Sequence, residues 1–282
     1  MSKIDVMIAG AQKSGTSSVV DILRASDGLM IHDSEEFPHF IYGNTDKIDK
    51  EVQLLYGKEK VNLAKSACLY KSEESLKLLK AHNSDVKIVL FLREPTERAF
   101  SSYLYALQKG WEVRKCPNSA IFGSYQGSDG SVEKMNTDYL FAGYYAHHIK
   151  ALLNIFDKSN VKVYLFEDFK VNPELIIKDL CNFIGVQFNF KITKSVSNKA
   201  ALPNSQFLAK HLNKKTKLNQ SFKALLPRSF RQGLRTKLLE FNKSSEKPPS
   251  LSEELRSSLE KYYEPKNVEL ERFLKLNLGK WK

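Results

Sequence analysis

Cysteine is scarce in this chain of 282 residues, which has only Cys68, Cys116 and Cys181. Their number is odd and their spacing matches no metal-binding motif, so we expect no cysteine-based metal site. Isolated cysteines of this kind are typical of reduced thiols in a cytosolic protein.

Long apolar runs are absent as well. No run reaches about 18 apolar residues, the length that indicates a transmembrane helix. The N-terminus has no charged lead followed by a long apolar core, which would indicate a secretory signal. We therefore expect a cytoplasmic protein without a transmembrane segment.

Acidic residues are outnumbered by basic ones, 32 against 44, and the formal net charge is +12. This balance favours anionic partners such as nucleic acid, a membrane surface or small polyanions. The basic residues concentrate within 210–247. Such a run is usually a solvated face, and a nucleic-acid-binding protein is the alternative. Because no RNP or zinc-finger signature accompanies the run, we predict no nucleic-acid partner.

One stretch near the start of the chain has the pattern of an anion-binding loop. Residues 10–18 read GAQKSGTSS, directly after the short, mostly apolar segment 4–9. This order predicts a buried strand, a glycine loop and a helix N-terminus. Such a turn directs backbone N–H groups and the positive end of a helix dipole at one place, which suits phosphate or sulfate. Lys13 adds a positive charge there.

The loop differs from the Walker A motif, G-x-x-x-x-G-K-[ST]. Here Thr16 follows the second glycine and Lys13 precedes it. A P-loop kinase or NTPase, which would also need Mg²⁺, is one alternative. A plain glycine turn with a solvated lysine is another.

A second cationic position follows the segment at 86–92, which reads VKIVLFL and predicts a central parallel strand. Arg93 comes directly after it, at the end of the strand where open α/β sheets bind ligands. Pro95 fits the first turn of a helix predicted over 96–108. Arg93 could bind a ligand or pair with a neighbouring acid such as Glu97.

The rest of the chain alternates strand and helix patterns. Further strands are expected at 29–31, within 61–70 and at 161–166, and helices at 73–82, 137–156, 172–183 and 252–276, the last interrupted by Pro265. Residues 110–136 predict a long polar loop, either a lid or partly disordered. The fold class is therefore α/β, with a central, mostly parallel sheet flanked by helices and a basic helical C-terminal portion.

Together, GAQKSGTSS and the later LREPTERAFSSY resemble motifs of sulfotransferases that use 3′-phosphoadenosine 5′-phosphosulfate (PAPS). KSACLY at 65–70 and residues 161–185 are also similar to segments of this family. Trp281 resembles a terminal tryptophan of the carbohydrate-type branch. As a whole, the chain resembles this heparan-sulfate-type branch and its soluble bacterial relatives. The chain departs from the family at Ala64 and Ala67, where the family has an acid and a proline.

The resemblance implies a P-loop-like sulfotransferase fold and a single domain over 1–282. Within it we expect a nucleotide-binding α/β core at 1–190 and a helical portion at 191–282 packed on that core. The implied reaction transfers a sulfuryl group from PAPS, with PAP as the product and without a metal. The acceptor would be a hydroxyl or amine of a saccharide or a small natural product. The sequence indicates no oligomeric state.

The resemblance also assigns roles to residues of this chain. The positions that would contact PAPS are Lys13, Ser14, Gly15, Thr16, Ser17, Ser18, Arg93, Ser101 and Lys199. Lys13 would offset charge on the leaving phosphate, and Lys65 would hold the sulfonate oxygens. Arg93 would bind the 3′-phosphate with its forked donors.

A general base is implied within EEFPHF at 35–40. Aligning the family's base motif on Phe40 selects Glu36 rather than Glu35. His39 is the alternative, because cytosolic members of the family use a histidine base.

Overall fold

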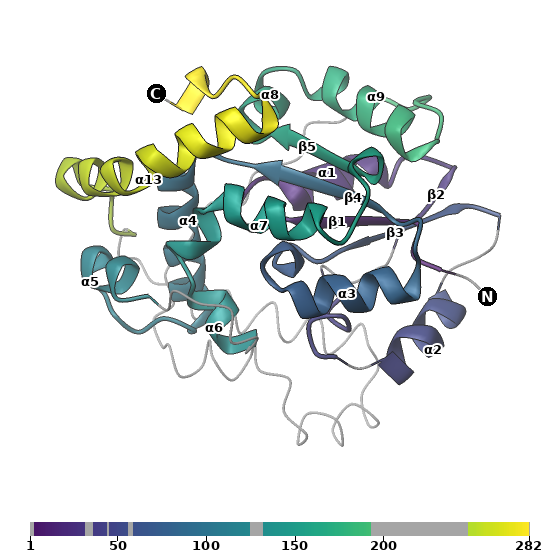
Figure 1. Cartoon of the computed structure of the whole chain (residues 1–282), viewed down its shortest axis with the longest axis horizontal. Helices are drawn as coiled ribbons and strands as arrows, with labels where there is room; N and C mark the ends of the chain where they lie inside the picture. Colours follow the sequence, from purple (N-terminus) through teal and green to yellow (C-terminus); the bar gives the residue numbers. More distant parts are fainter. Residues whose placement is uncertain are drawn as a thin grey trace.

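The described part of the chain contains one sheet of five strands (Figure 1). The structure, a computed structural model, describes residues 3–31, 36–43, 45–55, 59–124, 132–192 and 248–281. Glu35, Lys199 and the basic run at 210–247 lie outside these residues. No helix among the described residues is long and apolar enough to cross a membrane.

The sheet is parallel at every neighbouring pair, in the order β2-β3-β1-β4-β5. The strands are β1 (Val6–Gly10), β2 (Leu29–Ile31), β3 (Val61–Lys65), β4 (Lys87–Leu92) and β5 (Val161–Leu165). β1 is buried along its whole length, as its apolar sequence predicts for a central strand. Because β2 and β3 lie on one side of β1 and β4 on the other, the strand order reverses at β1. Open α/β sheets bind ligands at such a switch point.

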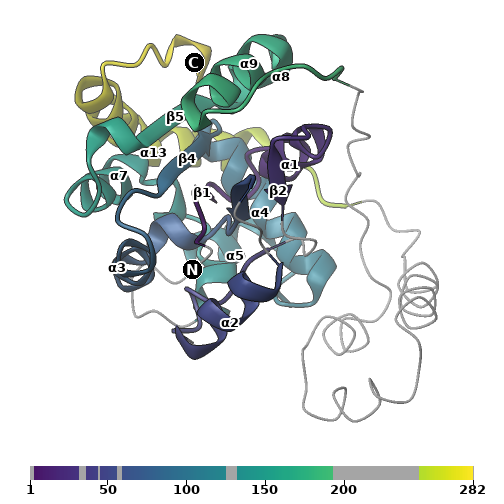
Figure 2. The same cartoon turned by 90° about the vertical axis from the view of Figure 1, so that its right-hand side faces the viewer.

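Helices cover both faces of this sheet. The helices among the described residues are α1 (Thr16–Leu23), α2 (Thr45–Leu55), α3 (Glu73–His82), α4 (Pro95–Lys109), α5 (Pro117–Phe122), α6 (Val132–Thr137), α7 (Tyr145–Leu153), α8 (Phe166–Val171), α9 (Pro173–Ile184) and α13 (Glu253–Leu274). Figure 2 shows α3 and α7 on one side of the strands and α1 on the other. Met7 packs in the core with α3 and α7, and its neighbour Ile8 packs with α1, α8 and α9. Successive strand residues point to opposite faces, so β1 contributes to both cores.

Helix α4 follows β4 and carries much of the site. Glu94 caps it by accepting hydrogen bonds from the N–H groups of Thr96 (2.8 Å) and Glu97 (2.7 Å), and Pro95 occupies its first turn. Its buried face packs in a third core with α5 and the first half of α13. Gly110 ends the helix with a φ of 71°, the left-handed conformation that glycine adopts without strain.

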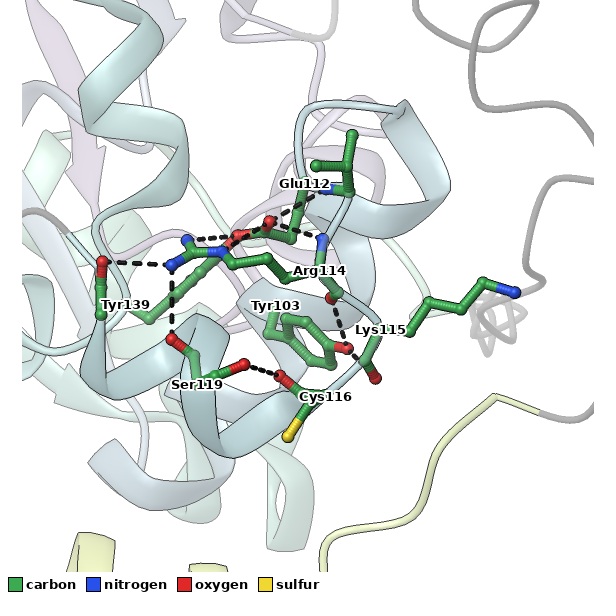
Figure 3. A network of polar contacts seen from close by, with 9 residues as sticks. Tyr103, Glu112, Arg114, Lys115, Cys116, Ser119 and Tyr139 are labelled. Carbon is green, nitrogen blue, oxygen red and sulfur yellow. Dashed lines mark hydrogen bonds and ion pairs between the residues drawn. The ribbon is translucent and has the colours of Figure 1, made fainter.

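The described residues within 110–136 include two short helices, α5 and α6, where the sequence predicted a polar loop. Glu112, which is 3% exposed, organises the segment after α4 (Figure 3). Its carboxylate accepts hydrogen bonds from Nε and Nη2 of Arg114 (3.0 and 2.8 Å) and from the Tyr139 hydroxyl (3.2 Å). A buried acid with these partners was not visible in the composition, which indicated only a polar stretch.

Two local predictions for helices were wrong. The helix predicted over 137–156 is interrupted at Gly143, where the Tyr263 ring lies so close that a Cβ would be 2.7 Å from it. The Tyr263 hydroxyl donates to the carbonyl of Leu140 (2.9 Å) just before this break. Conversely, Pro265 does not interrupt α13, which continues through it. The break at Gly143 agrees with the low helix propensity of glycine, whereas the helix through Pro265 goes against the local preference of proline, and α13 packs on α7.

Candidate functional site

The loop between β1 and α1 forms an anion cradle at the switch point of the sheet. The N–H of Ala11 donates to the carbonyl of Phe91 in β4 (2.8 Å), which fixes the start of the loop. Lys13 and Gly15 both have positive φ angles, 71° and 78°. Left-handed residues within a turn make neighbouring N–H groups converge, and α1 begins at Thr16 with its first N–H groups unpaired. A non-glycine residue at positive φ is strained, and such strain is often found at binding sites.

Two features of the loop fit a phosphate-like ligand. The Ser14 side chain is 0% exposed, and its Oγ has no hydrogen-bond partner among the described residues. At Gly15, an added Cβ would lie 2.5 Å from the Phe166 ring, so only glycine allows this close packing. The cradle thus contains the buried Ser14 hydroxyl, which is available for a hydrogen bond, and the Gly15 backbone, which carries no side chain.

Arg93 and side chains of helix α4 contact this loop at several points. The Ser102 hydroxyl donates to the Gln12 side-chain carbonyl (2.9 Å), and Arg93 Nη1 donates to the backbone carbonyl of Lys13 (3.3 Å). The Lys13 ammonium lies 4.4 Å from the centroid of the Tyr105 ring. Loop conformation and α4 position are therefore coupled.

Lys13 carries a depressed pKa. Burial, together with repulsion from Arg93, Lys109 and Lys65, lowers the pKa of Lys13 to about 8. Because the charges that act on Lys13 are positive, this cluster of cations favours the binding of an anion. Binding of an anion would raise the pKa of Lys13 again, because it stabilises the charged ammonium.

A second part of the site lies at the end of β3. The Lys65 ammonium, 7% exposed, donates to the Ser17 hydroxyl at 2.8 Å and pairs with Oε1 of Glu36 at 3.1 Å. The other carboxylate oxygen of Glu36 accepts a hydrogen bond from the N–H of Ala67 at 2.7 Å. Glu36 remains accessible, with 45% of its side chain exposed. These contacts therefore connect Ser17, at the start of α1, to the Glu36 carboxylate through the buried Lys65 side chain.

Arg93 is held at the end of β4. Its Nη2 pairs with Oε2 of Glu97 (3.3 Å), as the sequence allowed, and Glu97 also binds Arg256 of α13 (2.7 Å). The guanidinium carbon lies 5.5 Å from the centroid of Phe166. Because 22% of the Arg93 side chain is exposed, its forked guanidinium is partly accessible to a ligand.

The backbone around Arg93 is also fixed. Its carbonyl accepts a hydrogen bond from the Tyr145 hydroxyl (2.8 Å), and the next N–H, that of Glu94, donates to Glu167 (3.1 Å). The second oxygen of Glu167 accepts from Nε1 of Trp281 (2.9 Å), and the Trp281 ring lies 6.0 Å from that of Tyr145. The last described residues of the chain thus brace the strand end that carries Arg93.

The structure brings Lys13, Ser17, Lys65, Glu36 and Arg93 to one edge of the sheet, through the contacts given above. Other predicted positions lie on the elements that carry these residues or next to them in the chain. Ser18 is half-buried in the first turn of α1. Ser101 is half-buried on α4, one turn beyond the residue that pairs with Arg93. His39 is half-buried, and its ring packs edge-on against Phe37 (5.0 Å). Lys199 lies outside the described residues.

Three residues of the site were not predicted: Tyr105, Phe166 and Glu167. Tyr105 had a usable signal, because it follows Ser101 by one helical turn and shares its side of α4. Phe166 and Glu167 follow β5, far along the chain, and nothing in their local sequence indicates contact with the loop. Among the described residues, no group of three or more His, Cys, Asp and Glu side chains is placed to hold a metal ion.

Comparison with known proteins identifies the family. The sequence model of the sulfotransferase domain matches residues 3–271. The crystal structure of a sulfotransferase from Alicyclobacillus acidocaldarius superposes with a TM-score of 0.69 at 19% identity, covering 100% of this chain and 99% of that one. The chain belongs to the sulfotransferase family. This finding confirms the predicted family, the α/β fold and the prediction of a sulfotransferase enzyme.

Two relatives found by sequence are larger proteins. The mouse bifunctional heparan sulfate N-deacetylase/N-sulfotransferase 4 is 24% identical over 74% of this chain and 22% of its own length. The Caenorhabditis elegans bifunctional heparan sulfate N-deacetylase/N-sulfotransferase 1 is 22% identical over 97% of this chain and 30% of its own length. The chain therefore spans less than a third of these relatives.

Proposed function

We propose that the protein transfers a sulfuryl group from PAPS to a hydroxyl or amine of a saccharide or small natural product. The observation that carries this proposal is the pairing of two cationic cradles at one edge of the sheet. The loop around Lys13 is one, and Arg93 is the other, linked to it by the hydrogen bond to the Lys13 carbonyl at 3.3 Å. PAPS carries anionic groups at both its 5′ and 3′ positions, so it requires two such sites.

The residues divide between the two ends of the donor. The N–H groups at the start of α1, with Ser14 and Thr16, would bind the 5′-phosphosulfate. Arg93 would bind the 3′-phosphate, with Ser101 on the same side of α4. Lys199 remains a predicted contact to the same phosphate. When bound, PAPS supplies an activated sulfuryl group, and the chain supplies position and charge.

Three side chains would act on the transfer itself. Lys13 would stabilise negative charge as it develops on the leaving phosphate. Lys65, between Ser17 and Glu36, would neutralise the sulfonate oxygens. Glu36 would remove the proton of the acceptor, because its exposed carboxylate lies 3.1 Å from the lysine that would hold the group being transferred. We place His39 second, because aligning the family's base motif on Phe40 selects Glu36.

The names of two relatives support a saccharide acceptor. Two distant relatives are named as heparan sulfate N-sulfotransferases, but this chain matches only part of each. The cytoplasmic location and the single-domain organisation over 1–282 stay predictions.

The donor is tested by thermal unfolding. A ligand that binds only the folded state raises the melting temperature. We expect PAP and PAPS to do so in the presence of EDTA, because both cradles consist of protein donors. A rise with ATP–Mg²⁺ and none with PAP would contradict the proposal.

The base is tested by Glu36→Gln, which keeps the shape of the side chain and removes its basicity. We expect kcat to fall by about 10²–10⁴, the usual effect of losing a general base, with PAP affinity retained. Glu35→Gln is the matched control and should be nearly silent. Loss of turnover in His39→Ala, with Glu36→Gln active, would move the assignment to the histidine. The assay needs an acceptor that the wild-type protein turns over and that is not already deprotonated.

A further inference from the structure

Tyr105 contributes a contact to the site that the reaction above does not use. The Lys13 ammonium lies 4.4 Å from the centroid of its ring, within the range of a cation–π interaction. The Lys109 ammonium lies 5.2 Å from the same centroid. The ring of Trp111 packs against that of Tyr105 at 5.6 Å and an interplanar angle of 81°.

The ring is held in place by the structure around it. Tyr105 lies one helical turn before Lys109 on α4, so the two side chains share one side of the helix. The helix ends at Gly110, and the N–H of Trp111 donates back to the carbonyl of Ala106 at 2.9 Å. The next residue, Glu112, anchors the network shown in Figure 3. Tyr105 thus lies on a fixed helix end rather than on a loose loop.

The charges around Lys13 explain why such a ring matters. Among the described residues, three charged groups act on its ammonium: Arg93 from the end of β4, Lys109 from α4 and Lys65 from the end of β3. All three are positive. The carboxylates nearest to these cations, Glu97 and Glu36, are paired with Arg93 and Lys65 instead. The negative face of an aromatic ring is a partner that stabilises a half-buried ammonium without adding a competing charge.

We propose that Tyr105 is a positioning residue for Lys13, whose ring face keeps the ammonium charged and on the α4 side of the loop. The assignment of the donor on which Lys13 acts rests on the proposed function; the contact between ring and ammonium does not. The ring rather than the hydroxyl carries the effect. Tyr105→Phe should therefore preserve it, whereas Tyr105→Leu and Tyr105→Gln should remove it.

The test measures the titration of Lys13 in the free, full-length protein. Acetic anhydride reacts only with a neutral amine, so the extent of acetylation at Lys13, quantified by peptide mass spectrometry over a pH series, gives its pKa. The exposed Lys77 serves as the internal reference. We expect the Lys13 midpoint to fall by about 0.5–1 pH unit in Tyr105→Leu and Tyr105→Gln and to stay at the wild-type value in Tyr105→Phe.

Turnover gives the second readout. In the Leu and Gln variants we expect kcat/KM for PAPS above pH 8 to fall by about 3–10-fold, following the shifted Lys13 titration of the free protein. Melting temperatures identify variants that fold, and two non-aromatic variants are available should one unfold. An unchanged Lys13 midpoint in a folded non-aromatic variant overturns the proposal, and so does an equal shift in Tyr105→Phe. A shifted midpoint in a protein that binds neither PAP nor PAPS supports the contact and refutes the proposed function.

Discussion

Ala67→Pro is a sharp test of how the candidate base is tuned. The N–H of Ala67 donates to Oε2 of Glu36 at 2.7 Å, and a proline has no N–H to donate. The backbone tolerates the change: the N–H of Leu69 closes a turn onto the Ser66 carbonyl at 2.9 Å, with Cys68 at φ −106° and ψ −2°. These values place Ala67 at the second position of a type I turn, where proline is favoured.

The expected size of the effect follows from this hydrogen bond. A hydrogen bond to a charged group contributes about 1.5–3 kcal/mol, and one pKa unit corresponds to about 1.4 kcal/mol. Because 45% of the Glu36 side chain is exposed, water replaces part of what is lost. We therefore expect the pKa of Glu36 to rise by about 0.5–1 unit, since the lost donor stabilised the carboxylate form.

The assay is the pH dependence of kcat with saturating PAPS. In Ala67→Pro the acidic limb should move to higher pH by about 0.5–1 unit, because the base now takes up its proton earlier as the pH falls. Ala67→Gly retains the N–H and is the matched control. An acidic limb that stays in place in a folded proline variant would refute the tuning of Glu36 by this N–H. A glycine variant that shifts as far as the proline variant would also refute it.

Three other predictions concern the cradles, the core and the C-terminal brace. Arg93→Ala should weaken PAP binding by about 10–100-fold, whereas Lys13→Ala should lower kcat more than donor affinity. Small and equal effects on kcat and on donor affinity in both variants would show that the two residues are only surface charges. Burial lowers the pKa of His148 to about 3, below an unfolded value of about 6.5, so the unfolded chain takes up the proton first as the pH falls. Urea unfolding should therefore show a loss of about 1.4 kcal/mol between pH 7.5 and pH 5.5 that His148→Gln abolishes. Trp281→Phe keeps the ring but loses the N–H to the Glu167 carboxylate, so it should cost about 1 kcal/mol of stability and weaken PAP binding; unchanged unfolding and binding would show that the brace has no effect.

The sequence alone was sufficient to predict the parts of the site that consist of residues adjacent in the chain. The glycine loop at 10–18 lies between a buried strand and a helix, and the residue after the strand at 86–92 is Arg93, so both cradles are visible in short patterns. Parallel strands then place them together, because the carboxyl ends of parallel strands meet at one edge. The pairing of Lys65 with Glu36 needed a family resemblance, since 29 positions separate the two residues in the chain.

Contacts that depend on tertiary packing could not be predicted. Phe166 packs on Gly15 and stacks with Arg93 although it lies in a different part of the chain. A local rule failed at Pro265, which continues a helix. At Gly143 the apolar spacing predicted a helix, whereas the break there agrees with the low helix propensity of glycine and leaves space for the Tyr263 ring.

The central claim is that two cradles bind a donor with phosphates at both ends. Calorimetric titration of the protein with PAP and with 5′-AMP, both in EDTA, tests it directly, because the two nucleotides differ only in the 3′-phosphate. We predict that PAP binds at least about tenfold more tightly than 5′-AMP, and that Arg93→Ala removes this advantage. Equal affinities of the wild-type protein for the two nucleotides would contradict the account.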